Sequence, residues 1–119
     1  MYAYNYETSS VYRNLEINDP TLLGFDNIKV WIDELLPDST SVVYEISFDS
    51  KVTWYTLPEV SSLTLEDGYT EKELGGSIDD ITSSAITTAY KFIIRISLAN
   101  DASARYETPS NKQLRAIWY

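Results

Sequence analysis

The sequence of 119 residues contains no cysteine and no histidine. Without cysteine the chain has no disulfides, thiolate zinc sites or cysteine nucleophiles, and without histidine it lacks the most common general base and metal ligand. Neither a G-x-S-x-G motif nor a phosphate-binding loop is present. Only carboxylate, lysine or tyrosine chemistry is left for an enzyme. We therefore expect a protein with no enzymatic activity, no catalytic residues and no cofactor.

Positive charge and long apolar runs are also scarce. Nine lysine and arginine residues stand against 18 aspartate and glutamate residues, so the formal net charge is −9. A surface this acidic repels the phosphates of nucleic acids and of anionic lipids. The longest apolar runs are far shorter than the about 20 residues that span a bilayer, and no targeting segment follows Met1. We expect a protein that is made in the cytoplasm and binds neither nucleic acid nor membranes.

The chain nevertheless has what a folded core requires. It is 44% hydrophobic and 13% aromatic, with only four glycines and four prolines, which argues against disorder. The length fits one domain, and no repeat or internal linker divides it. We interpret residues 1–10 as an N-terminal arm and residues 11–119 as a single domain.

Alternation of apolar and polar residues is the dominant pattern. It covers 28–33, 42–49 and 90–99, and it recurs in Tyr2, Tyr4 and Tyr6. A period of two is typical of half-buried strands, and β-branched and aromatic residues, which fill these runs, favour the same structure. Short segments with turn-forming residues separate the runs, at 18–20, 37–39, 49–51, 66–68, 75–77 and 100–101.

About six to eight antiparallel strands, each with one apolar face, must cover that face with a second sheet. The sequence therefore predicts an all-β fold, a two-layer antiparallel β-sandwich with jelly-roll-like or Greek-key connections. Residues 78–90 are ambiguous. Their spacing permits a short helix capped by Ser77, whereas their serine and threonine content favours a connection that begins a strand.

The most specific local feature is SFDSKVTW at 47–54. It resembles the Asp-box pattern Ser-x-Asp-x-Gly-x-Thr-Trp, with Ser47, Asp49, Thr53 and Trp54 at the expected spacing. In such a hairpin the aspartate accepts backbone hydrogen bonds across the turn and the tryptophan packs beneath it. Lys51 occupies the glycine position, where a positive φ is favoured. We interpret the feature as a structural turn rather than a binding site.

Acidic residues cluster at 33–34, 66–67, 71–73 and 79–80. Neighbours in a strand point to opposite faces, so adjacency does not give the facing carboxylates that a glycosidase needs. We interpret these clusters as solvated surface. Calcium at 66–67 or 79–80 is a minor alternative, because the EF-hand spacing is absent, and we expect no metal site.

The aromatic residues are ten tyrosines, three tryptophans and three phenylalanines. Trp31 and Tyr55 lie out of phase with the apolar side of their strands, and the tyrosines of the arm either add to a neighbour's sheet or lie over their own. The candidate interface or glycan contacts are thus Tyr2, Tyr4, Tyr6, Trp31 and Tyr55. The alternative is that these aromatics complete the core.

The order of strands and turns in two long segments resembles that of a known class of domains. VWIDELLPDSTSVVYEISFDSKVTWYTLP at 30–58 and YKFIIRISLANDASARYETPSNKQLRAIW at 90–118 contain a strand, a turn at 37–40, the Asp-box-like hairpin, and two further strands, the second entered through Thr108 and Pro109. This arrangement resembles the small β-sandwich domains of bacteriophage tail, baseplate and fibre proteins over roughly residues 28–118.

The resemblance implies a virion structural or appendage protein, located in the virion. Its implied partners are copies of itself and other virion proteins, with a host surface glycan as a further partner. It carries over no catalytic residue, because the domains it resembles are not catalytic. The first alternative function is a carbohydrate-binding module that recognises surface glycans, and the second is a carboxylate-dependent glycosidase, which needs two facing acids.

Overall fold

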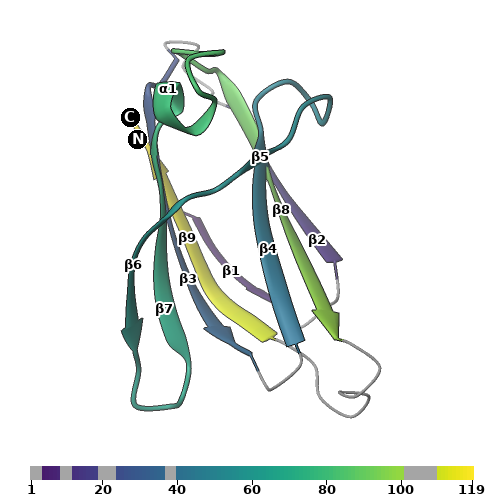
Figure 1. Ribbon diagram of the computed structural model, residues 1–119, viewed down its shortest axis with the longest axis vertical. Coiled ribbons are helices and arrows are strands. Elements are labelled where there is room, and N and C mark those ends of the chain that lie inside the picture. Colours follow the sequence, from purple (N-terminus) through teal and green to yellow (C-terminus); the bar gives the residue numbers. More distant parts are fainter. Residues whose placement is uncertain (1–3, 9–11, 19–23, 37–39, 101–109) are drawn as a thin grey trace.

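The computed structural model describes residues 4–8, 12–18, 24–36, 40–100 and 110–119, with side chains from 24–36, 41–97 and 113–119. These residues form nine strands and one helical turn (Figure 1). The strands are β1 (Tyr4–Thr8), β2 (Tyr12–Asn18), β3 (Asn27–Leu35), β4 (Thr40–Ser47), β5 (Tyr55–Thr56), β6 (Glu59–Thr64), β7 (Thr70–Ser77), β8 (Lys91–Asn100) and β9 (Ser110–Trp118). The helical turn is α1 (Ile78–Ile81).

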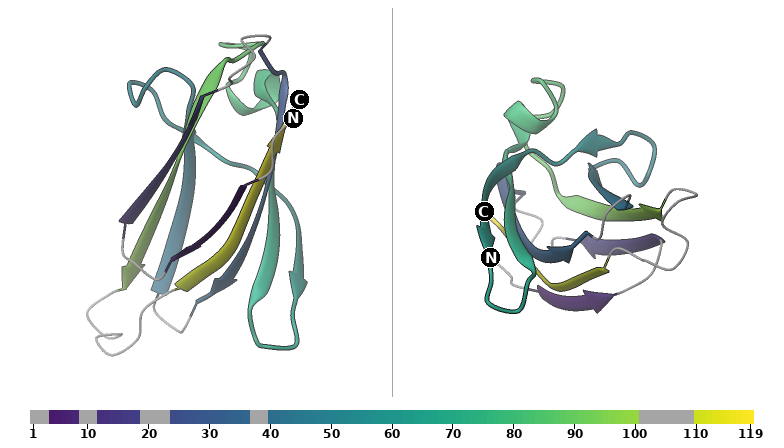
Figure 2. Two further views of the ribbon diagram at one scale, coloured as in Figure 1. Left: turned by 180° about the vertical axis from the view of Figure 1, so that it is seen from behind. Right: turned by 60° about the horizontal axis from the view of Figure 1, so that its bottom comes forward.

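The strands make two antiparallel sheets that face each other (Figure 2). One sheet has five strands in the order β1-β9-β3-β7-β6, and the other has four in the order β2-β8-β4-β5. With β6 set aside, the chain changes sheet at every step except from β4 to β5, and the first strand lies beside the last, which is the jelly-roll connection pattern. The predicted all-β, two-layer antiparallel sandwich is confirmed.

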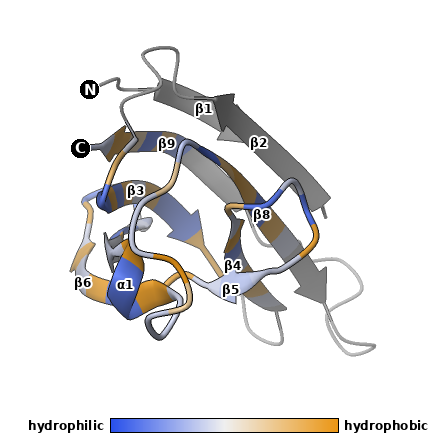
Figure 3. Ribbon diagram, turned by 90° about the horizontal axis from the view of Figure 1, so that it is seen from above, coloured by the Kyte–Doolittle hydropathy of each residue, from blue (hydrophilic) through white to orange (hydrophobic). Residues whose placement is uncertain are grey.

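The core lies between the sheets and follows the predicted alternation. The inward positions of β3 and β8 include Ile28, Val30 and Ile32 and Phe92, Ile94 and Ile96, each 1% exposed or less. Hydrophobic and hydrophilic residues also alternate along β9 (Figure 3). The rings of Phe92 and Trp118 pack edge to face at 5.2 Å between centroids. The apolar face of each sheet is therefore covered by the other sheet.

The turn predicted at 75–77 is wrong, because these residues end β7. Gly76 pairs with Ile28 and Gly75 with Lys29, so the strand continues through both glycines. Gly75 has a φ of +116°, and a Cβ there would lie 2.2 Å from the carbonyl oxygen of Ile28. The glycines thus permit a close approach of two backbones rather than a chain reversal.

Residues 78–90 combine the two structures that the sequence left open. The Ser77 side chain accepts a hydrogen bond from the Asp80 amide at 3.1 Å and caps α1, as its position predicts. The helix ends after one turn, where Ser83 and Ser84 adopt positive φ. The remaining residues connect it to β8.

Residues 4–8 of the expected N-terminal arm form β1, the strand at one edge of the five-stranded sheet. β1 pairs with β9, with Tyr4 opposite Ala116 and Tyr6 opposite Leu114. The segment therefore pairs within its own chain. The division into an arm at 1–10 and a domain at 11–119 stays a prediction.

Candidate functional site

β7 and β6 end the five-stranded sheet, and β4 and β5 end the four-stranded sheet; we call this side of the sandwich the open side. A pocket of about 300 Å³ lies here. Apolar and polar side chains from both sheets line it: Leu36, Val42, Val43, Leu57 and Leu74, together with Glu34, Tyr44, Thr56, Glu59 and Lys72.

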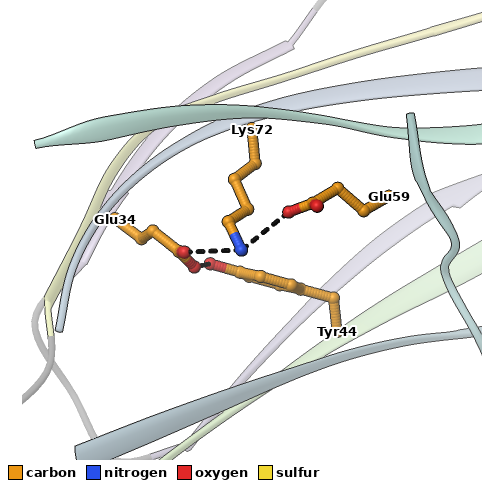
Figure 4. A network of polar contacts seen from close by, with 4 residues as sticks. All are labelled: Glu34, Tyr44, Glu59 and Lys72. Atoms are coloured by element: carbon orange, nitrogen blue, oxygen red, sulfur yellow. Dashed lines mark hydrogen bonds and ion pairs between the residues drawn. The ribbon is translucent and has the colours of Figure 1, made fainter. Parts of the chain in front are cut away.

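Four of the polar residues form a hydrogen-bonded network that joins the sheets (Figure 4). The Tyr44 hydroxyl donates to Glu34 Oε2 at 2.7 Å. Lys72 Nζ lies 3.0 Å from Glu34 Oε1 and 2.7 Å from Glu59 Oε1. We call Glu34, Tyr44, Glu59 and Lys72 the clasp. It links β3, β6 and β7 of the five-stranded sheet to β4 of the other sheet.

The clasp follows from the same alternation that builds the core. Glu34 continues the inward series of Val30 and Ile32 and is only 4% exposed. The preceding Asp33 is 6% exposed, so the prediction that the 33–34 pair is solvated surface is wrong. A carboxylate buried to this extent needs charged or hydrogen-bonding partners, and Tyr44 and Lys72 supply them.

The electrostatics of the clasp favour a charged lysine. The hydrogen bond to Glu59 raises the pKa of Lys72 above its usual value, with a further contribution from Glu34, against the opposing effect of partial burial. The two carboxylates are bridged by this ammonium group, whereas a carboxylate glycosidase holds a sugar between its two acids. The arrangement is therefore an ion-paired cluster within the five-stranded sheet, which the Tyr44 hydrogen bond links to the other sheet.

β6 is the outermost strand of its sheet. All six of its residues are exposed, including Val60 at 59% and Leu63 at 61%. Its first residue, Glu59, is the clasp carboxylate held by Lys72. The strand pairs with β7 on one side, and in the described part of the chain no strand pairs with its other side.

The Asp-box-like residues come together in one turn. The Ser47 hydroxyl donates to Asp49 Oδ1 at 2.8 Å, and the Thr53 amide donates to the same oxygen at 2.7 Å. Lys51 has a φ of +76° and donates its amide to Ser47 Oγ at 3.0 Å. The turn thus takes the positive φ that the glycine of the pattern would take.

Trp54 ends this turn against β8. The Arg95 guanidinium lies 3.9 Å from the centre of the Trp54 ring and donates two hydrogen bonds to Glu45 Oε1, at 2.8 and 3.0 Å. The hairpin is therefore fixed to the outer face of the four-stranded sheet by a cation–π contact and an ion pair.

Of the predicted contact aromatics, the structure describes the side chains of Trp31 and Tyr55, which lie on different sheets. Trp31 is half-buried on the outer face of the five-stranded sheet, with the Arg115 guanidinium 5.6 Å from its ring. Tyr55 packs against the core, with its ring 6.3 Å from that of Phe48. Tyr2 and the side chains of Tyr4 and Tyr6 lie outside the described residues.

The clasp was missed from sequence, although it left a signal. Glu34 is in phase with the apolar residues of its strand, and so is Tyr44 with those of β4. Acidic residues at inward positions are the signature of a paired, buried charge. Its partners Lys72 and Glu59 lie on strands that the alternation did not reveal.

Among the described residues, no group of three or more acidic side chains is arranged to hold a metal ion, and no helix is long and apolar enough to cross a bilayer. No protein-family model, curated protein or solved structure matches the chain.

Proposed function

We propose that the protein is a non-enzymatic structural or appendage module of a bacteriophage virion, which assembles with copies of itself and with other virion proteins through the surfaces of its β-sandwich. The jelly-roll pattern is compatible with this function, since such folds occur in viral capsid proteins and in lectins. A fold alone does not decide between them. The decision rests on a surface feature.

The observation that carries the proposal is the exposed edge strand β6. Val60 and Leu63 leave most of their side-chain surface in water, on a strand with every residue exposed. An unpaired edge with aliphatic side chains is a template for another strand. Such an edge is expected of a protein that works by assembly.

Light scattering of the purified chain over a range of protein and salt concentrations tests the proposal. We expect a defined oligomer, because symmetric association is the ordinary product of a structural interface. A molar mass of one chain under all conditions would contradict assembly.

A carbohydrate-binding module is the second candidate, and Trp31 favours it. Its half-buried ring lies beside Arg115, which forms an ion pair with Glu71 at 3.2 Å, and an aromatic ring flanked by charged groups suits a sugar. A glycan array comparing the native chain, Trp31→Ala and the distant Tyr90→Ala tests it. Binding lost only in Trp31→Ala supports this candidate, and no glycan bound by the native chain contradicts it.

A further inference from the structure

The backbone groups on the free side of β6 can be assigned from its pairing with β7. Residues of an antiparallel strand alternately exchange hydrogen bonds with their partner and direct both groups away from it. The Leu65 amide donates to the Tyr69 carbonyl at 2.7 Å, and Leu63 lies opposite Glu71 in the same register. Leu63 and Leu65 therefore bond toward β7, and Ser62 and Thr64 present their N–H and C=O groups to the free edge.

Natural edge strands are protected by lysine, proline, inward charges or β-bulges. In β6 the register with β7 shifts between Glu59 and Ser61, so a bulge interrupts the start of the strand. The residues after it, 61–64 (SSLT), pair regularly with β7 and contain no lysine, proline or charge. The one charge of the strand, Glu59, is held by Lys72 at 2.7 Å. The free edge is therefore uncharged along the residues that would pair.

We propose that β6 pairs antiparallel with β6 of a second copy of this chain, with the two-fold axis at Ser62, so that the two five-stranded sheets become continuous. This inference rests on the proposed function and names its interface. With the axis at Ser62, the outward groups of Ser62 meet those of Ser62 in the second copy, and Ser61 lies opposite Leu63, within the part of β6 that follows the register shift.

The register is self-complementary in charge and in shape. Leu63 lies opposite Ser61 of the second copy and diagonal to its Leu63, within reach of an aliphatic contact. Residues 61–64 carry no charge, so no like charges face each other across the pair. A copy of the chain therefore supplies what this edge needs: a short, uncharged strand with aliphatic and hydroxyl side chains.

The charge of the whole chain predicts how the dimer responds to salt. Each copy carries a formal charge of −9, so long-range repulsion opposes their approach. Salt screens this repulsion over about 10 Å at 0.1 M ionic strength. We expect salt to strengthen the association, whereas it would weaken binding to a basic partner.

Cross-linking tests the register directly, because the native chain has no cysteine. Directly opposite, hydrogen-bonded residues have Cα atoms about 5.5 Å apart, within the range that a disulfide bridges. We expect Ser62→Cys to form a covalent dimer under mild oxidation at least about tenfold faster than Val52→Cys, a control at an 81% exposed site in the 47–54 turn. Equal rates would overturn the proposal.

The substitution Ser62→Pro tests the pairing of β6 with a second copy without a cysteine cross-link. Proline removes the outward N–H but no hydrogen bond to β7, a position that an edge strand tolerates. We expect a folded monomer by circular dichroism and light scattering, and Leu63→Lys serves in its place if the proline variant unfolds. If the native chain is an oligomer and the folded variant keeps its mass, the β6 interface is wrong while assembly stands. A monomeric native chain would overturn both.

Discussion

The hydroxyl of Tyr44 joins the two sheets at the open side. It donates to Glu34, whose side chain is 4% exposed. We expect Tyr44→Phe to lower the free energy of unfolding by about 2 kcal/mol, because a buried carboxylate oxygen loses a charge-assisted hydrogen bond. Urea denaturation measures the change. Tyr90→Phe, at a 53% exposed site, is the control and should change stability by less than about 0.5 kcal/mol. Equal effects of the two substitutions would show that the clasp adds nothing.

Asp49 makes the stability of the chain depend on acid. The hydrogen bond from the Thr53 amide lowers the pKa of Asp49 below 3.8, its unperturbed value. Since the folded pKa is the lower one, the stabilisation is present above 3.8 and is lost as the pH falls through the folded pKa.

The matched variant for this effect is Asp49→Asn, which keeps an oxygen to accept from Thr53 and loses the titration. We expect the urea midpoints of the native chain and the variant to converge as the pH is lowered from about 6 to about 2.5. A constant difference between the two midpoints over this range would contradict the assignment.

The turn at 47–54 holds strain that a glycine would release. Lys51 has a φ of +76°, which costs a residue with a Cβ about 1 kcal/mol. We expect Lys51→Gly to keep or raise the free energy of unfolding, by up to about 1 kcal/mol, because relief of strain offsets the added freedom of the unfolded chain. Val52→Gly, next along the chain and without positive φ, should lower it by about 0.5–1 kcal/mol. Thermal unfolding of both variants measures the two changes in stability. Equal losses of stability in Lys51→Gly and Val52→Gly would mean that Lys51 is unstrained.

The strands that sequence reasoning located are those buried on one face. Residues 28–33, 42–49 and 90–99 alternate because one side faces the core, and they became β3, β4 and β8. β6 was not predicted, because all its residues are exposed and burial therefore imposed no alternation of apolar and polar residues on it. At Gly75 and Gly76 the glycines that predicted a turn serve a close contact between β7 and β3, which depends on a partner distant in sequence.

The candidate site was less predictable for the same reason. Glu34 was visible as part of an acidic pair, but its role depends on Tyr44, Lys72 and Glu59, which come from three other strands. The Asp-box-like turn was readable because Ser47, Asp49 and Thr53 contact one another within a few residues. Local hydrogen bonds produce a recognisable sequence motif. Contacts between distant strands show in the sequence only as a polar residue at an inward position of the alternation.

The clasp and the free edge are parts of one arrangement. Lys72 binds Glu59 at the start of β6 and Glu34 on β3, and Tyr44 extends the link to the other sheet. The position of β6 is thus coupled to the packing of both layers. A strand that must meet its copy in one register benefits from such support, because preorganisation lowers the entropic cost of association.

The two edge strands of the five-stranded sheet lead to different predictions for the stability and for the self-association of the shortened chain 11–119. β1 lies at one edge and β6 at the other, and residues 4–8 already pair with β9 of their own chain. We therefore expect deletion of residues 1–10 to lower the unfolding midpoint, because β9 loses an edge partner, and to leave self-association unchanged, because β6 is untouched. Circular dichroism and light scattering of the shortened chain, with and without Ser62→Pro, measure both effects. Association that is lost on deletion but retained in the full-length Ser62→Pro variant would instead place the interface at the N-terminal arm, since an arm that leaves its own sheet to pair with a neighbour's needs β1 and not β6.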